Sequence, residues 1–145
     1  MDYKKFGESY YIRFDKGDEI VGGILDICKR EKILSATYSG IGGCGDITVA
    51  TYIFEEQKFL PHNKTGSLEM ISLNGNISAD DNDNIFEHTH ALFSFLDEKG
   101  DMKFIGGHLT KAVVLYTAEI VLTPVKDGVI RRNQDTATGI TVWKL

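Results

Sequence analysis

The sequence has few of the residues and segments that would assign it to a disulfide-rich or membrane class. Its 145 residues include only two cysteines, Cys28 and Cys44, which do not form a motif spacing. We therefore expect no disulfide and a reducing compartment. No stretch approaches the roughly twenty apolar residues of a membrane-spanning helix, and the first residues lack the apolar core of a signal peptide. These absences favour a soluble, cytoplasmic protein.

An excess of basic residues is also missing. The chain has 16 lysines and arginines against 21 aspartates and glutamates, a net charge of −5. This balance opposes strong attraction to phosphate backbones. The basic residues form only short pairs (Lys4-Lys5, Lys29-Arg30 and Arg131-Arg132), which we interpret as solvated surface. No basic stretch interleaved with aromatic residues suggests a nucleic-acid groove.

Proline is also scarce: the chain contains only Pro61 and Pro124. No linker, repeat or low-complexity segment divides the chain, so we expect residues 1–145 to form one domain. One helix is predicted from about Asp18 to Glu31, because apolar residues recur there at helical spacing and Lys29-Arg30 stand in the last turn.

The rest of the chain is rich in β-branched and aromatic residues between Gly, Asn, Asp and Pro punctuation. The apolar run from Val113 to Thr123 suggests a strand that is buried on both faces. One main helix packed on a mostly antiparallel sheet of about seven strands is an α+β fold. The predicted strands are Ile33–Ser39, Asp46–Phe54, Leu68–Ser78, Ile85–Asp97, Met102–Gly107, Val113–Thr123 and Gly139–Leu145.

Three histidines are spaced so that a single hairpin would bring them together. His88 and His90 are two residues apart, so in a strand both point to one face, about 7 Å apart. The segment 97–101 reads as a type I turn closed by a glycine bulge, which sets His108 opposite His90. A loop one residue longer or shorter, or a bulge at Gly106-Gly107, would turn His108 to the other face.

Three converging imidazoles need a chemical partner. They repel one another when protonated and lack hydrogen-bond partners when neutral. A divalent cation resolves both problems, and zinc suits neutral imidazoles at about 2.0–2.1 Å. The sequence therefore predicts a site for zinc or another divalent metal at His88, His90 and His108, with one coordination position left open.

Other suggestive patterns are better explained by local structure. The segment Gly40–Gly45 matches the dinucleotide fingerprint, but a strand-like segment follows where a helix is required, so we expect a turn or bulge. The run Asp80–Asn84 lacks the glycine and distal glutamate of a calcium loop and reads as an acidic turn. Cys44 lacks an activating base and is interpreted as a packed residue. His62 is interpreted as solvated.

Four segments in order resemble the plants and prokaryotes conserved (PPC) domain: Leu68–Ser78, His88–His90, Gly106–Leu109 and Thr117–Leu122. The resemblance implies an α+β fold with a largely antiparallel sheet. It also implies a homotrimer in stand-alone prokaryotic members. The three histidines match the metal positions of the family, and the resemblance would place this pocket near a subunit boundary, lined by Asn74 or Glu69.

Plant relatives join this domain to AT-hook segments and act as nuclear DNA-binding regulators, and bacterial relatives often carry a DNA-binding label. This sequence has no Arg-Gly-Arg core to enter an AT-rich minor groove, and Arg131-Arg132 lacks the flanking glycine and proline. DNA binding is thus implied by the family label but is not supported by charge.

Two functions of different classes follow from the histidines. The first is a homotrimeric binding module whose zinc receives a small anion or a side chain of a partner protein. The alternative is a zinc-dependent hydrolase or lyase, in which the open position lowers the pKa of a bound water to about 7. Glu87 alternates to the other face of its strand, so the general base would be Glu69 or Glu119.

Overall fold

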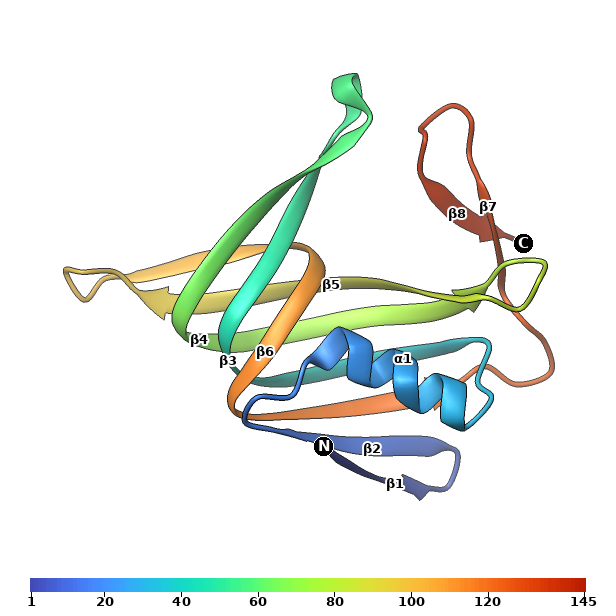
Figure 1. Ribbon diagram of the computed structural model, residues 1–145, viewed down its shortest axis with the longest axis horizontal. Helices are drawn as coiled ribbons and strands as arrows, with labels where there is room; N and C mark the ends of the chain where they lie inside the picture. The colour runs from blue at the N-terminus through green and yellow to red at the C-terminus, as the bar shows by residue number, and fades with distance from the viewer.

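Eight strands form one sheet, and a single α-helix lies against it (Figure 1). The computed structural model describes residues 1–145. The helix is α1 (Ile20–Arg30), and a short 3-10 turn, η1 (Phe54–Glu56), joins β3 to β4. The strands are β1 (Asp2–Phe6), β2 (Ser9–Asp15), β3 (Ala36–Ile53), β4 (Lys58–Ala79), β5 (Ile85–Leu96), β6 (Met102–Pro124), β7 (Arg131–Gln134) and β8 (Thr141–Lys144).

The α+β class is confirmed, but the strand prediction is wrong in detail. The two segments predicted before Phe54 are one strand, β3, and the two predicted between Met102 and Thr123 are one strand, β6. Three strands, β1, β2 and β7, were not predicted. The sequences of β1 and β2 carry charged residues between the apolar ones, and β7 contains only polar residues, so all three lack the dense β-branched pattern of the other strands.

The strand order is β1-β2-β6-β3-β4-β7-β8, and β5 pairs with both β4 and β6. Strands β3, β4, β5 and β6 therefore form a closed circuit of hydrogen-bonded neighbours. All pairs are antiparallel except β4 and β7, which meet in parallel at Ala79 and Arg131, so the sheet is mixed.

The glycine-rich segment 40–45 lies inside β3 and contains two bulges, between Gly40 and Gly42 and between Cys44 and Asp46. It is therefore a bulge and not a turn. A Cβ atom at Gly42 would lie 2.6 Å from the Cα of Ala118 in β6, so glycine permits close approach of the two backbones. The segment continues as strand, without the helix that a dinucleotide-binding turn requires.

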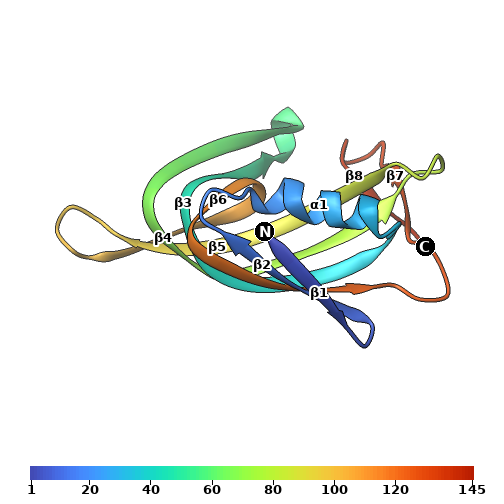
Figure 2. The same ribbon diagram turned by 60° about the horizontal axis from the view of Figure 1, so that its bottom comes forward.

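Helix α1 lies within its predicted range and packs on one face of the sheet (Figure 2). The Glu19 carboxylate accepts hydrogen bonds from the backbone amides of Val21 and Gly22 at the helix start. Two basic residues, Lys29 and Arg30, stand in the last turn, where the helix dipole favours positive charge. The structure contains no helix with the length and apolar character of a membrane span.

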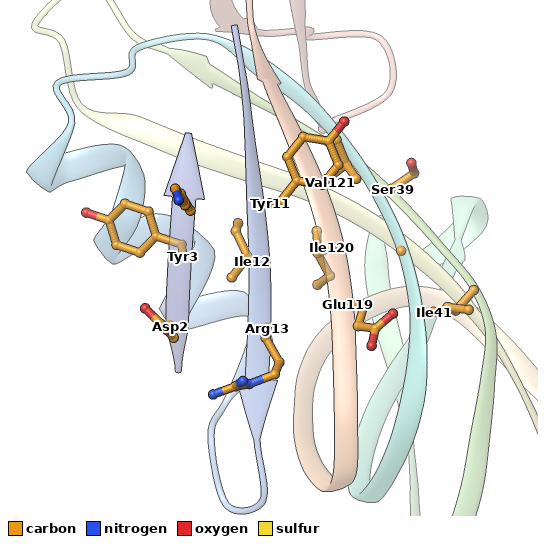
Figure 3. Close-up of a pocket in the computed structure, with 12 residues that line it drawn as sticks. Asp2, Tyr3, Tyr11, Ile12, Arg13, Ser39, Ile41, Glu119, Ile120 and Val121 are labelled. Carbon is orange, nitrogen blue, oxygen red and sulfur yellow. The ribbon is translucent and has the colours of Figure 1, made fainter. Parts of the chain in front are cut away.

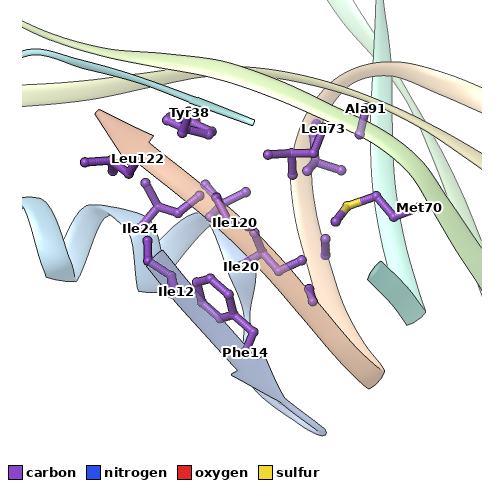
Figure 4. Packing of buried hydrophobic residues seen from close by; sticks show 14 of the residues in the cluster. Ile12, Phe14, Ile20, Ile24, Tyr38, Met70, Leu73, Ala91, Ile120 and Leu122 are labelled. Carbon is purple, nitrogen blue, oxygen red and sulfur yellow. The ribbon is translucent and has the colours of Figure 1, made fainter. Parts of the chain in front are cut away.

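The apolar face of α1 packs on inward side chains of the sheet, among them Ile12 and Phe14 of β2 and Ile120 of β6 (Figure 4). Buried residues alternate along β6, with Ala118, Ile120 and Leu122 inside and Glu119 exposed. The prediction that this strand is buried on both faces is therefore wrong, because α1 covers only one face of it. Burial of the apolar residues contributes about 25 cal/mol per Å² of apolar surface removed from water.

Candidate metal centre

Strand β6 changes its partner at His108. Between Met102 and His108 it pairs with β5, and from His108 to Pro124 it pairs with β3. His108 therefore lies opposite His90 on one side and opposite Ala50 on the other. We call the point where β6 changes partner the strand fork. Gly107, just before it, has φ +149, and a Cβ atom there would lie 2.7 Å from the carbonyl oxygen of Ala50. Glycine is the residue that fits this position without strain.

The hairpin that sets the register closes as predicted. The amide of Asp97 donates to the carbonyl of Asp101 at 2.9 Å, and the amide of Gly100 donates to the carbonyl of Asp97 at 3.0 Å. Gly100 has φ +81, as the bulge position of this turn requires. The ladder between β5 and β6 runs unbroken to the pair His90 and His108.

The three imidazoles converge at this fork. Their ring centroids are 5.2 Å apart for His88 and His90, 5.3 Å for His88 and His108, and 5.6 Å for His90 and His108. One ring nitrogen of each lies within 4.8 Å of the others. Two nitrogens of a tetrahedral zinc site are about 3.3 Å apart, given Zn–N distances of about 2.0–2.1 Å. Metal binding would therefore require side-chain rotations that bring the nitrogens closer together.

The surroundings of His88 and His108 favour the neutral imidazole, which is the form that binds a metal. Burial, followed by the nearby His88 and His90, lowers the pKa of His108 to about 4. Burial, followed by Arg132 and His90, also lowers the pKa of His88. The Nδ1 atom of His108 is buried and has no hydrogen-bond partner. Neutral imidazoles with an unpaired buried nitrogen fit the donor set of zinc.

His88 and His108 open into a cavity of about 320 Å³ formed by four parts of the chain. The β3–β4 hairpin, β5, β6 and the C-terminal β7–β8 segment each contribute side chains. The Phe59 ring lies 4.8 Å from the His108 ring, centroid to centroid. The lining consists of Tyr52, Gln57, Phe59, Glu87, His88, His108, Arg132, Gly139, Ile140 and Thr141.

The two predicted lining residues occupy different places. Asn74 lies opposite His90 on β4 and lines a smaller cavity of about 260 Å³ together with His88, His90 and Trp143. Glu69 is exposed, lies opposite Ser94, and does not line the cavities that contain the histidines. The structure brings Asn74, but not Glu69, to the histidines.

Glu119, the other suggested general base, borders a separate groove on the outer face of β1, β2, β6 and β3 (Figure 3). This groove is larger, at about 530 Å³, and Glu119 lies opposite Arg13 in it. It holds no histidine or cysteine. The clustered metal-binding groups make the smaller histidine cavity the better candidate for chemistry.

Glu87, which the strand alternation excludes as a general base, lines the same cavity as His88 and His108. Glu87 points to the other face of β5 from His88. Because β6 pairs with β5 only as far as the pair His90 and His108, residues 85–89 have no partner strand on that side. The Glu87 side chain can therefore reach the cavity past this unpaired edge. Thr89 donates its hydroxyl hydrogen to the Glu87 carboxylate, and the Tyr38 hydroxyl donates in turn to Thr89. Burial raises the pKa of Glu87.

Arg132 was missed, because the pair Arg131-Arg132 was interpreted as solvated surface. Arg131 forms a salt bridge with Asp83 at 2.7 Å, at the edge of an acidic turn. Arg132 is half-buried, lines the cavity, and places Nη2 3.4 Å from Nδ1 of His88. The surface interpretation is therefore wrong for Arg132. Nothing in the local sequence distinguishes the two arginines. They differ because neighbouring residues of β7 point to opposite faces of the strand.

Fold and site together define an α+β protein with a three-histidine cluster at a strand fork. The Plants and Prokaryotes Conserved (PCC) domain, also abbreviated PPC, matches residues 1–126, and the chain belongs to this family. The matched segment includes all three histidines. Arg132 and the β7–β8 hairpin lie beyond it.

Solved structures with the same fold cover nearly the whole chain. A plant- and prokaryote-conserved protein from Pyrococcus horikoshii is 32% identical, with a TM-score of 0.81 over 99% of this chain and 95% of that one. A metal-containing protein from Archaeoglobus fulgidus is 27% identical, with a TM-score of 0.85 over 100% and 99%. A protein from Bacteroides thetaiotaomicron, provisionally named as DNA-binding, is 24% identical, with a TM-score of 0.88 over 99% and 96%. No curated protein matches the chain.

Proposed function

We propose that this protein is a metal-binding module in which His88, His90 and His108 hold zinc or another divalent metal and a small anion completes the site. The observation that carries the proposal is the convergence of three imidazoles where β6 changes partner. The similarity to a metal-containing protein supports it. When bound, zinc supplies a Lewis acid with one exchangeable position.

We also propose that the module is a cytoplasmic homotrimer with the metal pocket close to a subunit boundary. Cross-strand pairing puts four exposed apolar residues on the face of the β5–β6 ribbon that carries His90 and His108. Contiguous exposed apolar side chains are typical of protein interfaces. These residues and their exposed fractions are Leu92 (40%), Leu96 (65%), Met102 (60%) and Phe104 (58%).

Metal analysis of protein prepared without chelators tests the site. We expect one zinc per chain in the wild type and in His62→Ala, which alters the exposed fourth histidine. We expect loss of the metal in the double variant His88→Ala/His108→Ala. Unchanged stoichiometry in the double variant would overturn the proposal. Light scattering coupled to size exclusion tests the trimer, and a monomer at micromolar concentration would contradict it.

A zinc-dependent hydrolase or lyase is a second candidate, favoured by the position of Glu87. Its carboxylate borders the same cavity as His88 and His108 and is held by Thr89. Burial raises its pKa, which is the direction that suits a group that takes up a proton. In this reading Glu87 replaces Glu69 and Glu119 as the base. A screen of ester, amide and phosphate substrates with Glu87→Gln as control tests it, and no turnover of any substrate favours the module.

Direct DNA binding has less support. The name of the Bacteroides protein suggests it, whereas the net charge of −5 opposes it. We expect no retained DNA in a gel-shift series at low ionic strength, where electrostatic binding is strongest. Salt-sensitive retention would instead support a nucleic-acid role.

A further inference from the structure

Arg132 brings a partly buried positive charge to the histidine cavity, where Glu87 is the nearby acidic group but does not form a salt bridge with it. Its neighbour Arg131 pairs with Asp83, whereas Arg132 forms no salt bridge and its Nε atom is buried without a hydrogen-bond partner. Buried guanidinium groups are normally paired, because an unpaired buried charge is costly. An arginine in this state at a cavity wall suggests that an anion is its partner.

The single hydrogen bond that Arg132 makes in the cavity, to His88, cannot persist when His88 binds a metal. Its Nη2 lies 3.4 Å from Nδ1 of His88, which can accept a hydrogen bond only through a free lone pair. A metal bound at Nδ1 uses that lone pair. A metal bound at Nε2 requires the proton of the neutral ring on Nδ1. In both cases Arg132 loses this acceptor when the metal binds, and its donors become available to a ligand.

The rest of the cavity indicates which kind of anion fits. A guanidinium presents two parallel donors that match a carboxylate or a phosphate. Glu87 lines the same cavity and is a second negative group there, which disfavours a dianion such as phosphate. Phe59 and Ile140 supply apolar wall in the cavity that contains His108. A singly charged head with a small organic body satisfies all three features.

We propose that Arg132 and the metal together bind a small organic carboxylate, with the guanidinium holding the carboxylate group and the β7–β8 hairpin forming one wall of the binding site. The inference rests on the proposed metal site and adds a chemical class of ligand to it. It also gives the C-terminal hairpin a function: the segment beyond residue 126 delivers the residue that recognises the ligand.

Calorimetric titration of the zinc-loaded full chain with lactate, lactamide and inorganic phosphate tests the proposal. Lactamide has nearly the shape of lactate without its charge. We expect lactate to bind at least tenfold more tightly than lactamide or phosphate. Arg132→Gln should weaken lactate binding by at least tenfold while it retains one zinc per chain. The lactate affinity of Arg132→Lys should lie between those of the wild type and Arg132→Gln, because lysine keeps the positive charge but lacks the two parallel donors of the guanidinium.

Arg131→Gln is the matched control, because it removes the neighbouring arginine of the same strand and leaves the cavity intact. We expect its affinity for lactate to equal that of the wild type. Equal lactate affinity in the wild type and Arg132→Gln, tighter binding of phosphate, or no binding of lactate to zinc-loaded protein would each overturn the inference. Wild-type protein that takes up no zinc would be detected by metal analysis before any titration, and would overturn the proposed function itself.

Discussion

His90 and His108 lie directly opposite each other across the β5–β6 ribbon, with ring centroids 5.6 Å apart. Two glycines stand at the two ends of the paired segment. Gly100 closes the hairpin, and Gly107 lets β6 leave β5 for β3 immediately before His108. The geometry of the metal site is therefore set by backbone conformation as much as by the histidines.

Gly107→Ala should disrupt the site without altering a metal ligand. The new Cβ atom would lie 2.7 Å from the carbonyl oxygen of Ala50, at φ +149. Backbone strain of this kind destabilises by roughly 1–3 kcal/mol, and the close contact adds to it. We expect a lower free energy of unfolding in urea and a zinc affinity at least tenfold weaker.

Gly100→Ala is the corresponding control. This residue also has positive φ, +81, but its Cβ atom would meet nothing within 4 Å. We expect a loss of about 1 kcal/mol of stability and normal zinc affinity. Equal zinc affinities for the two variants would show that the fork at Gly107 does not position His108.

Zinc should raise the stability of the wild type in a manner that depends on His108. A ligand that binds only the folded state at a hundredfold excess over its Kd stabilises it by about 2.7 kcal/mol. We expect this gain, measured by thermal unfolding with and without zinc, in the wild type and in His62→Ala. It should vanish in His108→Ala. A zinc-induced gain that survives in His108→Ala would contradict the three-histidine site.

The histidine cluster could be predicted from sequence because it depends on local features. The spacing of His88 and His90, the turn at 97–101 and the strand period together determine the register. Glu87 and Arg132 could not be found in this way. Glu87 reaches the cavity because β6 departs from β5, and Arg132 reaches it because a hairpin distant in sequence folds against the same opening. Both depend on tertiary arrangement, which residue spacing does not encode.

The buried chain of hydrogen bonds behind the cavity should be sensitive to loss of its middle member. Thr89→Val would leave the Tyr38 hydroxyl and the Glu87 carboxylate without their shared partner. Each unsatisfied buried polar group costs about 1–3 kcal/mol, so we expect a loss of about 3 kcal/mol in urea unfolding. Thr48→Val, which removes a hydrogen bond to Asn63 at the surface, should change stability by less than about 0.5 kcal/mol. Similar losses in the two variants would contradict this account.

Both cysteines should resist thiol reagents in the folded protein. Cys28 and Cys44 are fully buried, and burial raises the pKa of each thiol to about 12. The thiolate is the reactive form, so at pH 8 almost none is available. We expect no labelling by iodoacetamide in buffer and labelling of both residues in guanidinium chloride, as read by mass spectrometry. Rapid labelling of Cys44 in the folded state would contradict its interpretation as a packed, unreactive residue.

Glu31 ties the end of α1 to the N-terminal strands and should make stability depend on pH. Its carboxylate accepts hydrogen bonds from the hydroxyls of Tyr3 at 2.8 Å and Tyr10 at 2.9 Å, and these lower its pKa below the ordinary value. A carboxyl group whose pKa is lower in the folded state stabilises the protein above its unfolded pKa of about 4.3. This stabilisation is lost as the pH falls through the folded pKa.

Glu31→Gln should therefore be less stable than the wild type at pH 7, and the difference should shrink as the pH falls from 5 to 3. Urea midpoints at pH 7, 5 and 3 measure this difference. Glu98→Gln, in the exposed turn between β5 and β6, should show no such convergence. A difference between Glu31→Gln and the wild type that stays constant from pH 7 to pH 3 would mean that the glutamine amide replaces the carboxylate as an acceptor. The tyrosine contacts would then hold the strands to α1 without any contribution from charge.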